Sequence, residues 1–195
     1  MTSAIYLAGP EVFLPPAIRQ DILRQKKAIL NSLGMQALSP CDNDAEVTLD
    51  AEGASAIYLG NIRMMESAAG ALVNLTPFRG PSADSGTVFE LGFLVARHVP
   101  AVGYSSCRQS YPQRVPSSEM GIDLNGAAIE PFGLADNLML ICGLETNQHC
   151  GLVLGNRTMP EKGFAPEHYF DPDLFREAAL LLQQRINRRT PHSKS

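Results

Sequence analysis

Two carboxylates on either side of a glycine turn are the residues of this sequence best placed to do chemistry. Asp84 and Glu90 lie within Asn74–Gly92 (NLTPFRGPSADSGTVFELG), and Glu90 falls in an otherwise apolar segment. An unpaired ionised carboxylate in a buried helix is costly, so its charge requires a reason. One reason is chemical: Glu90 acts as a nucleophile or base, with Asp84 as its partner. The other is structural: Glu90 pairs with Arg79 or Arg97, or binds amides at the start of the helix.

The residues around this pair predict a strand, a loop and a helix, in that order. Gly70–Leu75 (GALVNL) is a short apolar run typical of a buried parallel strand, and prolines and glycines follow it. Ligands of open parallel sheets bind beyond the carboxyl ends of the strands, so a loop that holds Asn74, Arg79 and Asp84 is a candidate site. The loop contains neither a dinucleotide fingerprint nor the Gly-Lys-Ser/Thr of a nucleotide triphosphate loop.

Strands alternate with helices along most of the chain. Periodicity and turn residues predict strands at Ala4–Ala8, Met35–Leu38, Gly70–Leu75 and Val99–Tyr104, and helices at about Pro16–Leu33, Ala54–Ala69, Val88–His98 and Asp171–Arg189. Asn137–Cys142 fits either a fifth strand or the start of a helix. The alternation indicates an α/β fold: one flavodoxin-like (Rossmann-like) domain over residues 1–195, with a parallel sheet flanked by helices.

Polar residues mark three places between and within these elements. Ser39–Gly53 is acidic and rich in turn residues, which favours a solvated surface loop over a catalytic lid. Ser105–Asn125 is a long polar excursion after the fourth strand. Asn61 interrupts the apolar stripe of the second helix, so it either reaches the end of a strand or is a buried, hydrogen-bonded asparagine.

Composition limits the classes of function. The chain has 195 residues, 45% of them hydrophobic, which is enough for one sizeable core. Its net charge of -4 and its scattered basic residues argue against nucleic-acid binding. The cysteines lack paired short spacings, so we predict neither a metal site nor a disulfide scaffold. Without a basic region followed by a long apolar run, the chain is expected to be cytoplasmic and to have no membrane partner.

Three stretches resemble the nucleoside 2-deoxyribosyltransferase family: IYLAGPEVF, GNIRMMESAAGALVNLTPFRG and above all PSADSGTVFELGF. The resemblance runs from the N-terminus to about Ser105. A weaker similarity in IEPFGLADNLML extends the resemblance to Leu140. The C-terminal helix at about Asp171–Arg189 lies outside the resemblance. The resemblance implies the transfer of a 2-deoxyribosyl group from one nucleobase to another in nucleotide salvage, without a metal or a dissociable cofactor. It also implies a homo-oligomer with shared active sites, whose partners are a deoxynucleoside and a free nucleobase.

The resemblance assigns catalytic roles to three residues. Glu90 matches the nucleophile of a retaining double displacement, which passes through a covalent glutamyl-deoxyribose ester. Asp84 matches the acid/base residue that protonates the departing base and deprotonates the incoming one, and Tyr6 matches the hydroxyl that positions the nucleophile. Asn61 falls where relatives carry an aspartate or asparagine near the base, and because an amide cannot transfer a proton, Asp84 must carry most of the acid/base work.

Further positions match residues that bind substrate in the family. Those that line the sugar and base pocket are Gly9, Phe13, Asn74 and Arg79, and Phe13 would stack on a planar base. Asp136 and Asn137 resemble residues that are presented to the adjacent subunit. Pro131 stands where we expect an aspartate, which affects the contacts that set base preference.

Two alternatives remain open at this point. Water that intercepts the ester would make the protein an N-glycoside hydrolase of (deoxy)nucleosides or nucleoside 5'-monophosphates. Relatives that hydrolyse monophosphates carry a serine-, glycine- and arginine-rich loop after the first strand, whereas here that loop is GPEVFLPPA and Glu11 would repel a phosphate. A noncatalytic flavodoxin-like ligand-binding module is the second alternative, although LAGP and VGYSS lack the residues of a receiver domain or a flavin phosphate loop.

Overall fold

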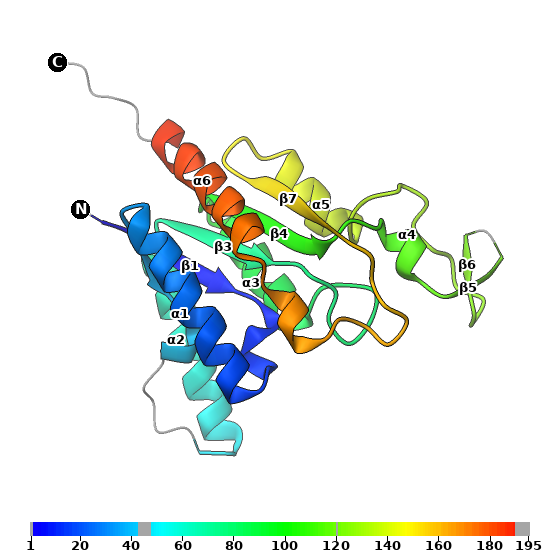
Figure 1. The fold of residues 1–195 in the computed structure, drawn as a ribbon, viewed down its shortest axis with the longest axis horizontal. Coiled ribbons are helices and arrows are strands. Elements are labelled where there is room, and N and C mark those ends of the chain that lie inside the picture. Colours follow the sequence, from blue (N-terminus) through cyan, green and yellow to red (C-terminus); the bar gives the residue numbers. More distant parts are fainter. Residues whose placement is uncertain (1, 43–47, 120, 190–195) are drawn as a thin grey trace.

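The central feature of the molecule is a parallel sheet of five strands in the order β2-β1-β3-β4-β7 (Figure 1). The computed structural model describes residues 2–42, 48–119 and 121–189, so part of the predicted loop Ser39–Gly53 lies outside the described residues. The strands are β1 (Ser3–Ala8), β2 (Met35–Leu38), β3 (Gly70–Asn74), β4 (Ala101–Cys107) and β7 (Gly151–Arg157). This order is flavodoxin-like, and the predicted fold class is confirmed.

Helices cover both faces of the sheet. One face carries α1 (Pro16–Ser32) and α6 (Pro172–Arg189), which lie in front of the strands in Figure 1. The other face carries α2 (Ala51–Ser67), α3 (Ser85–Ala96) and α5 (Leu138–Glu145). The remaining pieces are η1 (Pro10–Phe13), η2 (Pro40–Asp42), α4 (Tyr111–Arg114), η3 (Pro166–Tyr169) and the antiparallel hairpin of β5 (Ser117–Glu119) and β6 (Ile122–Asp123).

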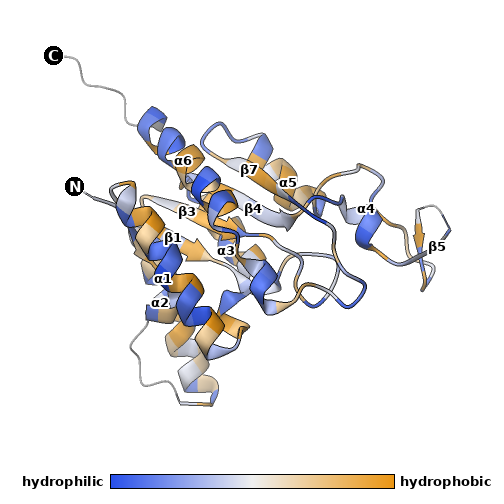
Figure 2. Ribbon diagram, viewed as in Figure 1, coloured by the Kyte–Doolittle hydropathy of each residue, from blue (hydrophilic) through white to orange (hydrophobic). Residues whose placement is uncertain are grey.

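Alternate residues of the strands pack into two hydrophobic cores, one on each face of the sheet. In β1, Ile5 and Leu7 pack under α1 and α6, whereas Tyr6 and Ala8 face α2, α3 and α5. All residues of the central strands β3 and β4 are buried, and in Figure 2 apolar residues concentrate in the strands while polar residues lie on the outer faces of α1 and α6. This alternation places the Tyr6 side chain on the same face of the sheet as α3, which carries Glu90.

Several element boundaries differ from the predicted ones because side chains cap the helices. α3 begins at Ser85 instead of near Val88, since the Asp84 carboxylate accepts a hydrogen bond from the Thr87 amide. α2 begins at Ala51 instead of Ala54, since Asp50 accepts one from the Gly53 amide.

The fifth strand is not at Asn137–Cys142. There the Asn137 side chain caps α5 by accepting a hydrogen bond from the Met139 amide, and the helical alternative is correct. The fifth strand is β7, an edge strand in which only two of the seven residues are buried and which has glycines at 151 and 155, so its sequence carries little strand pattern. The excursion Ser105–Asn125 contains the end of β4, then α4 and the β5–β6 hairpin.

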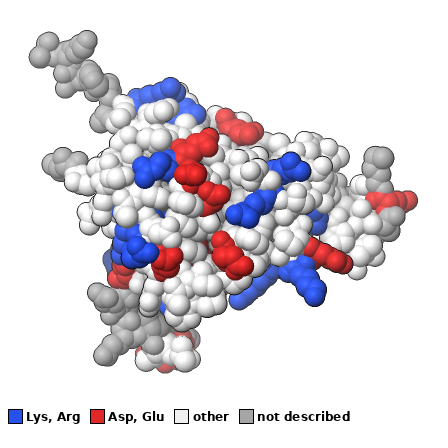
Figure 3. Space-filling view, viewed as in Figure 1, with Lys and Arg blue, Asp and Glu red and all other residues white. Residues whose placement is uncertain are grey.

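Charges are mixed over the face that α1 and α6 form. Figure 3 shows basic and acidic groups interspersed there, as the scattered basic residues of the sequence led us to expect. Within residues 2–42, 48–119 and 121–189, none of the helices combines the length and the hydropathy that a bilayer crossing requires.

Candidate active site

A cavity of about 920 Å³ lies beyond the carboxyl end of β1, at the point where the strand order reverses between β1 and β3. Its wall includes Gly9 and Phe13 from the loop after β1, Asn61 from α2, and Asp84 and Glu90 from the start of α3. Five of the residues singled out from the sequence therefore meet in one cavity. Arg19, Cys41 and Thr87 also line it. No sequence pattern singles out Arg19 or Cys41, whereas Thr87 lies between the two carboxylates in the sequence.

Glu90 is held by Tyr6. The Tyr6 hydroxyl donates a hydrogen bond of 2.6 Å to Oε1 of Glu90, and Tyr6 itself is fully buried. Burial, followed by the charge of Glu90, raises the pKa of Tyr6, so the phenol remains a donor. The bond fixes the orientation of the Glu90 carboxyl group through Oε1.

The environment of Glu90 favours its protonated form. The pKa of this half-buried carboxyl is raised from 4.5 to about 7, chiefly by burial. The Tyr6 hydrogen bond lowers the pKa, whereas the charges of Asp84 and Glu11 raise it further. Neither arginine proposed as its ion-pair partner serves that role in the described part of the chain.

Both of these arginines are engaged elsewhere. Arg79 lies over the rings of Phe13 and Phe78, at 5.1 and 4.7 Å from their centroids, and Arg97 pairs with Glu66 at 3.7 Å. The ion-pair explanation for the charge of Glu90 is therefore wrong, and a carboxylate without a cation in a cavity wall is typical of a functional site.

Asp84 stands at the entrance to α3. Its Oδ2 accepts hydrogen bonds from the Thr87 amide at 3.0 Å and the Thr87 hydroxyl at 3.2 Å. These bonds make it the helix cap while its half-buried side chain contributes to the cavity wall. The carboxyl groups of Asp84 and Glu90 thus occupy the same wall of the cavity, about one and a half helical turns apart.

Asn61 and Phe13 suit the recognition of a polar, planar ligand. The Oδ1 atom of Asn61 is buried and has no hydrogen-bond partner among the described residues. Such an atom is costly to leave unpaired, so a ligand that donates to it would bind favourably. The Phe13 ring is 53% exposed and stacks on Phe78 with centroids 5.5 Å apart and an interplanar angle of 18°.

Asn74 lies beneath the cavity and does not line it. It is fully buried, donates to Glu11 Oε1 at 2.7 Å and to the Tyr169 carbonyl at 2.8 Å, and accepts from the Thr76 amide at 3.0 Å. Glu11 in turn forms a buried ion pair with Lys26 of α1. Lys26 lies fifteen residues from Glu11 in the chain, so local sequence patterns do not reveal this ion pair. The charge of Glu11 still acts on Glu90, and the repulsion of a phosphate by Glu11 stays a prediction.

Asp136 and Asn137 are also outside the cavity wall. Asp136 is 1% exposed and is hydrogen bonded to residues of the same chain, while Asn137 caps α5 and its side-chain amide donates to Glu130. The described residues contain no group of three or more His, Cys, Asp or Glu side chains that could hold a metal ion.

Comparison with known proteins shows the family to which the chain belongs. The profile of the nucleoside 2-deoxyribosyltransferase family matches residues 5–139, more than half of the chain. The chain belongs to this family. An uncharacterized protein of Schizosaccharomyces pombe is 33% identical over 117 residues, 58% of this chain and 54% of that protein, so the chain spans about half the length of this relative.

Two solved structures show the same fold. A 2-desoxiribosyltransferase from Leishmania mexicana is 31% identical and superimposes with a TM-score of 0.61 over 71% of this chain and 85% of its own. A conserved protein from Enterococcus faecalis is 19% identical, with a TM-score of 0.52 over 97% of this chain and all of its own. The second likeness concerns the fold alone.

Proposed function

We propose that this protein transfers 2-deoxyribosyl groups between nucleobases, with Glu90 as the nucleophile. The observation that carries the proposal is the Tyr6–Glu90 hydrogen bond of 2.6 Å in the wall of the large cavity, without a cation paired to Glu90 in the described residues. Membership of the nucleoside 2-deoxyribosyltransferase family supports the same reaction class.

In the first half of the reaction, Glu90 Oε2 attacks the anomeric carbon of a deoxynucleoside. The bond between that carbon and the base nitrogen breaks, its electron pair leaves with the base, and Asp84 supplies the proton that neutralises the base. The product is an ester between Glu90 and deoxyribose. Tyr6 holds Oε1 throughout, so the carboxylate does not rotate away from the sugar.

In the second half, a nitrogen of the incoming base attacks the same carbon. The ester bond breaks, its electron pair returns to Glu90, and Asp84 accepts the proton that the base releases. Two inversions restore the original configuration. Because the pKa of Glu90 is raised to about 7, the carboxylate is a stronger nucleophile than an ordinary glutamate and is about half ionised near neutral pH.

The base would occupy the part of the cavity near Phe13 and Asn61. The exposed Phe13 ring offers a stacking surface, and Asn61 Oδ1 offers an unpaired acceptor for an amino or imino group. The protein is further proposed to act in nucleotide salvage in the cytoplasm as a homo-oligomer. The side chains of Phe89, Phe132 and Met139 are 52%, 61% and 75% exposed, which supports a contact with a second copy.

The function is tested by chromatography of the purified protein incubated with 2'-deoxyinosine and free adenine. New 2'-deoxyadenosine supports the proposal, and the matched control is Glu90→Gln, which keeps the shape of the side chain and an acceptor for the Tyr6 hydroxyl. Hypoxanthine without a new nucleoside would replace transfer with hydrolysis. Since Arg19 lines the cavity, a parallel incubation uses 2'-deoxyinosine 5'-monophosphate as the donor.

A further inference from the structure

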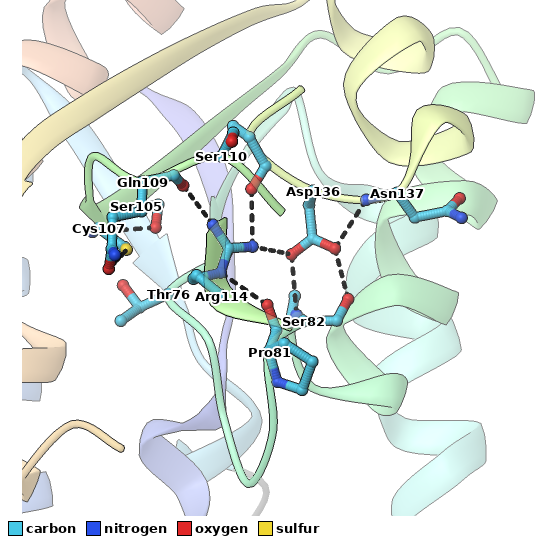
Figure 4. Close-up of polar contacts among 12 residues, drawn as sticks. Thr76, Pro81, Ser82, Ser105, Cys107, Gln109, Ser110, Arg114, Asp136 and Asn137 are labelled. Carbon is cyan, nitrogen blue, oxygen red and sulfur yellow. Dashed lines mark hydrogen bonds and ion pairs between the residues drawn. The ribbon is translucent and has the colours of Figure 1, made fainter. Parts of the chain in front are cut away.

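A buried arginine joins three loop segments next to the candidate acid/base residue. The Arg114 side chain is 1% exposed and directs its donors at the ends of these loops (Figure 4). Its Nε donates to the Pro81 carbonyl at 2.7 Å, its Nη1 to the Gln109 carbonyl, and its Nη2 to the Ala135 carbonyl at 2.8 Å. One guanidinium therefore holds together segments that lie more than twenty residues apart on either side.

Asp136 completes the cluster from the opposite side. Its Oδ2 lies 3.5 Å from Nη2 of Arg114 and accepts a hydrogen bond of 3.0 Å from the Ala83 amide, and its Oδ1 accepts from the Ser82 hydroxyl and, at 2.8 Å, from the Asn137 amide. Pro81 and Ser82 belong to the loop between β3 and α3, and in Figure 4 they lie below Arg114 and Asp136.

The loop is thus fixed at three consecutive residues, each through a different group: the carbonyl of Pro81, the hydroxyl of Ser82 and the amide of Ala83. The next residue is Asp84, whose side chain caps α3. The cluster therefore sets the backbone from which Asp84 projects into the cavity wall.

Stabilisation of the fold does not by itself explain why Arg114 and Asp136 form a buried cluster. A buried ion pair seldom stabilises a fold more than apolar residues of the same volume would, because both charges must leave water. A buried arginine that donates hydrogen bonds from Nε, Nη1 and Nη2 provides a fixed geometry, since its planar guanidinium binds several carbonyls at once. Arg114 uses its guanidinium on irregular backbone, where no helix or sheet ladder supplies the order.

We infer that Arg114 and Asp136 are positioning residues that hold Asp84 in register with the leaving base. The inference rests on the proposed function. It differs from the role that family resemblance implies for Asp136, which is a contact with the neighbouring subunit. Neither residue touches substrate in this account; both act through Asp84.

The variants that test it are Arg114→Lys and Asp136→Asn. A lysine keeps the charge but cannot reach three carbonyls, and an asparagine presents a donor where Asp136 has only acceptors. Displacement of a catalytic group by about 1 Å costs up to about 100-fold, so we expect kcat to fall about 10- to 100-fold, and more for bases that need protonation to leave.

The matched control is Leu182→Ala. Leu182 is fully buried on α6 near Gly70, at the start of β3 and so at the opposite end of the sheet from the loop. This variant lowers the unfolding temperature through loss of packing but should leave kcat unchanged at a temperature where the protein is folded.

A double-mutant cycle separates positioning from general destabilisation. If Arg114 acts through Asp84, Arg114→Lys changes kcat less than about threefold in an Asp84→Asn background. An equal loss in both backgrounds, or an unchanged kcat in the single variant, overturns the inference.

Amide hydrogen exchange of the peptide spanning 78–90 gives a readout that does not depend on activity. Arg114→Lys should speed exchange at Ala83 and at the start of α3. If the wild-type protein exchanges no bases, the proposed function fails. Hydrogen exchange then decides separately whether the cluster orders the loop, and unchanged protection in Arg114→Lys overturns that ordering role as well.

Discussion

Replacing Glu90 with glutamine should change how the stability of the protein depends on pH. The unfolded carboxyl has a pKa of 4.5 and the folded one a pKa of about 7, so the folded state retains a proton that the unfolded state has lost between these values. The wild-type protein therefore loses stability as the pH rises from 4.5 to about 7, and this contribution is fully present only below 4.5.

The size of the effect follows from the shift. A full displacement from 4.5 to about 7 corresponds to about 3 kcal/mol, and because water reaches this half-buried side chain we expect about 1–3 kcal/mol. Glu90→Gln cannot ionise, and its carbonyl still accepts the Tyr6 hydrogen bond. The variant should match the wild type near pH 4.5 and exceed it by this amount above pH 7.

The assay is thermal unfolding of both proteins at a series of pH values from about 4.5 to 8. For a chain of this length, 1 kcal/mol shifts the midpoint by about 2–4 °C, so the two curves should diverge by about 2–12 °C above pH 7. Titrating groups that do not interact with Glu90 cancel in the comparison, whereas Asp84 and Glu11 contribute to the difference through their charges. Parallel curves across the range would refute the claim that burial raises the pKa of Glu90.

Three other substitutions probe the same site. Tyr6→Phe removes the hydrogen bond that lowers the pKa of Glu90, so the acidic limb of the kcat/KM profile should move to higher pH and transfer at neutral pH should slow about tenfold; an unmoved limb would contradict this. Asp84→Asn should keep the helix cap, with chemical unfolding within about 0.5 kcal/mol of wild type, but slow turnover of purine donors at least about 100-fold in a steady-state assay; full activity would exclude Asp84 as the acid. Gly9→Ala places a Cβ 2.0 Å from Glu11 Oε2 and should destabilise the protein by about 1–3 kcal/mol in urea, whereas wild-type stability would mean that the loop after β1 relaxes freely.

Local sequence patterns were sufficient to predict the strands and helices whose apolar residues follow a regular spacing. β1 and β2 alternate or run apolar and are bounded by turn residues, and α1 repeats its apolar residues at helical spacing. Asp84 and Glu90 were placed together because a strand-loop-helix order fixes where the loop must lie relative to a parallel sheet.

Features that depend on contacts distant in sequence were not predicted. Lys26 forms an ion pair with Glu11 only because α1 packs against β1, and Arg114 meets Asp136 only because α4 and α5 converge on the loop after β3. β7 was not predicted because an edge strand that contains glycines and exposed residues has a weak sequence pattern. It forms a strand through its pairing with β4. Long-range pairing decides such residues, and a single sequence does not display it.

The most direct test of the central claim is mass spectrometry of the protein after incubation with 2'-deoxyinosine and rapid acid quench. We expect a mass increase of one deoxyribosyl group, located by digestion on the peptide that contains Glu90. The adduct should disappear when adenine is added before the quench, and Glu90→Gln should not form it. Base exchange without any adduct, or an adduct on another residue, would contradict the assignment of Glu90 as the nucleophile.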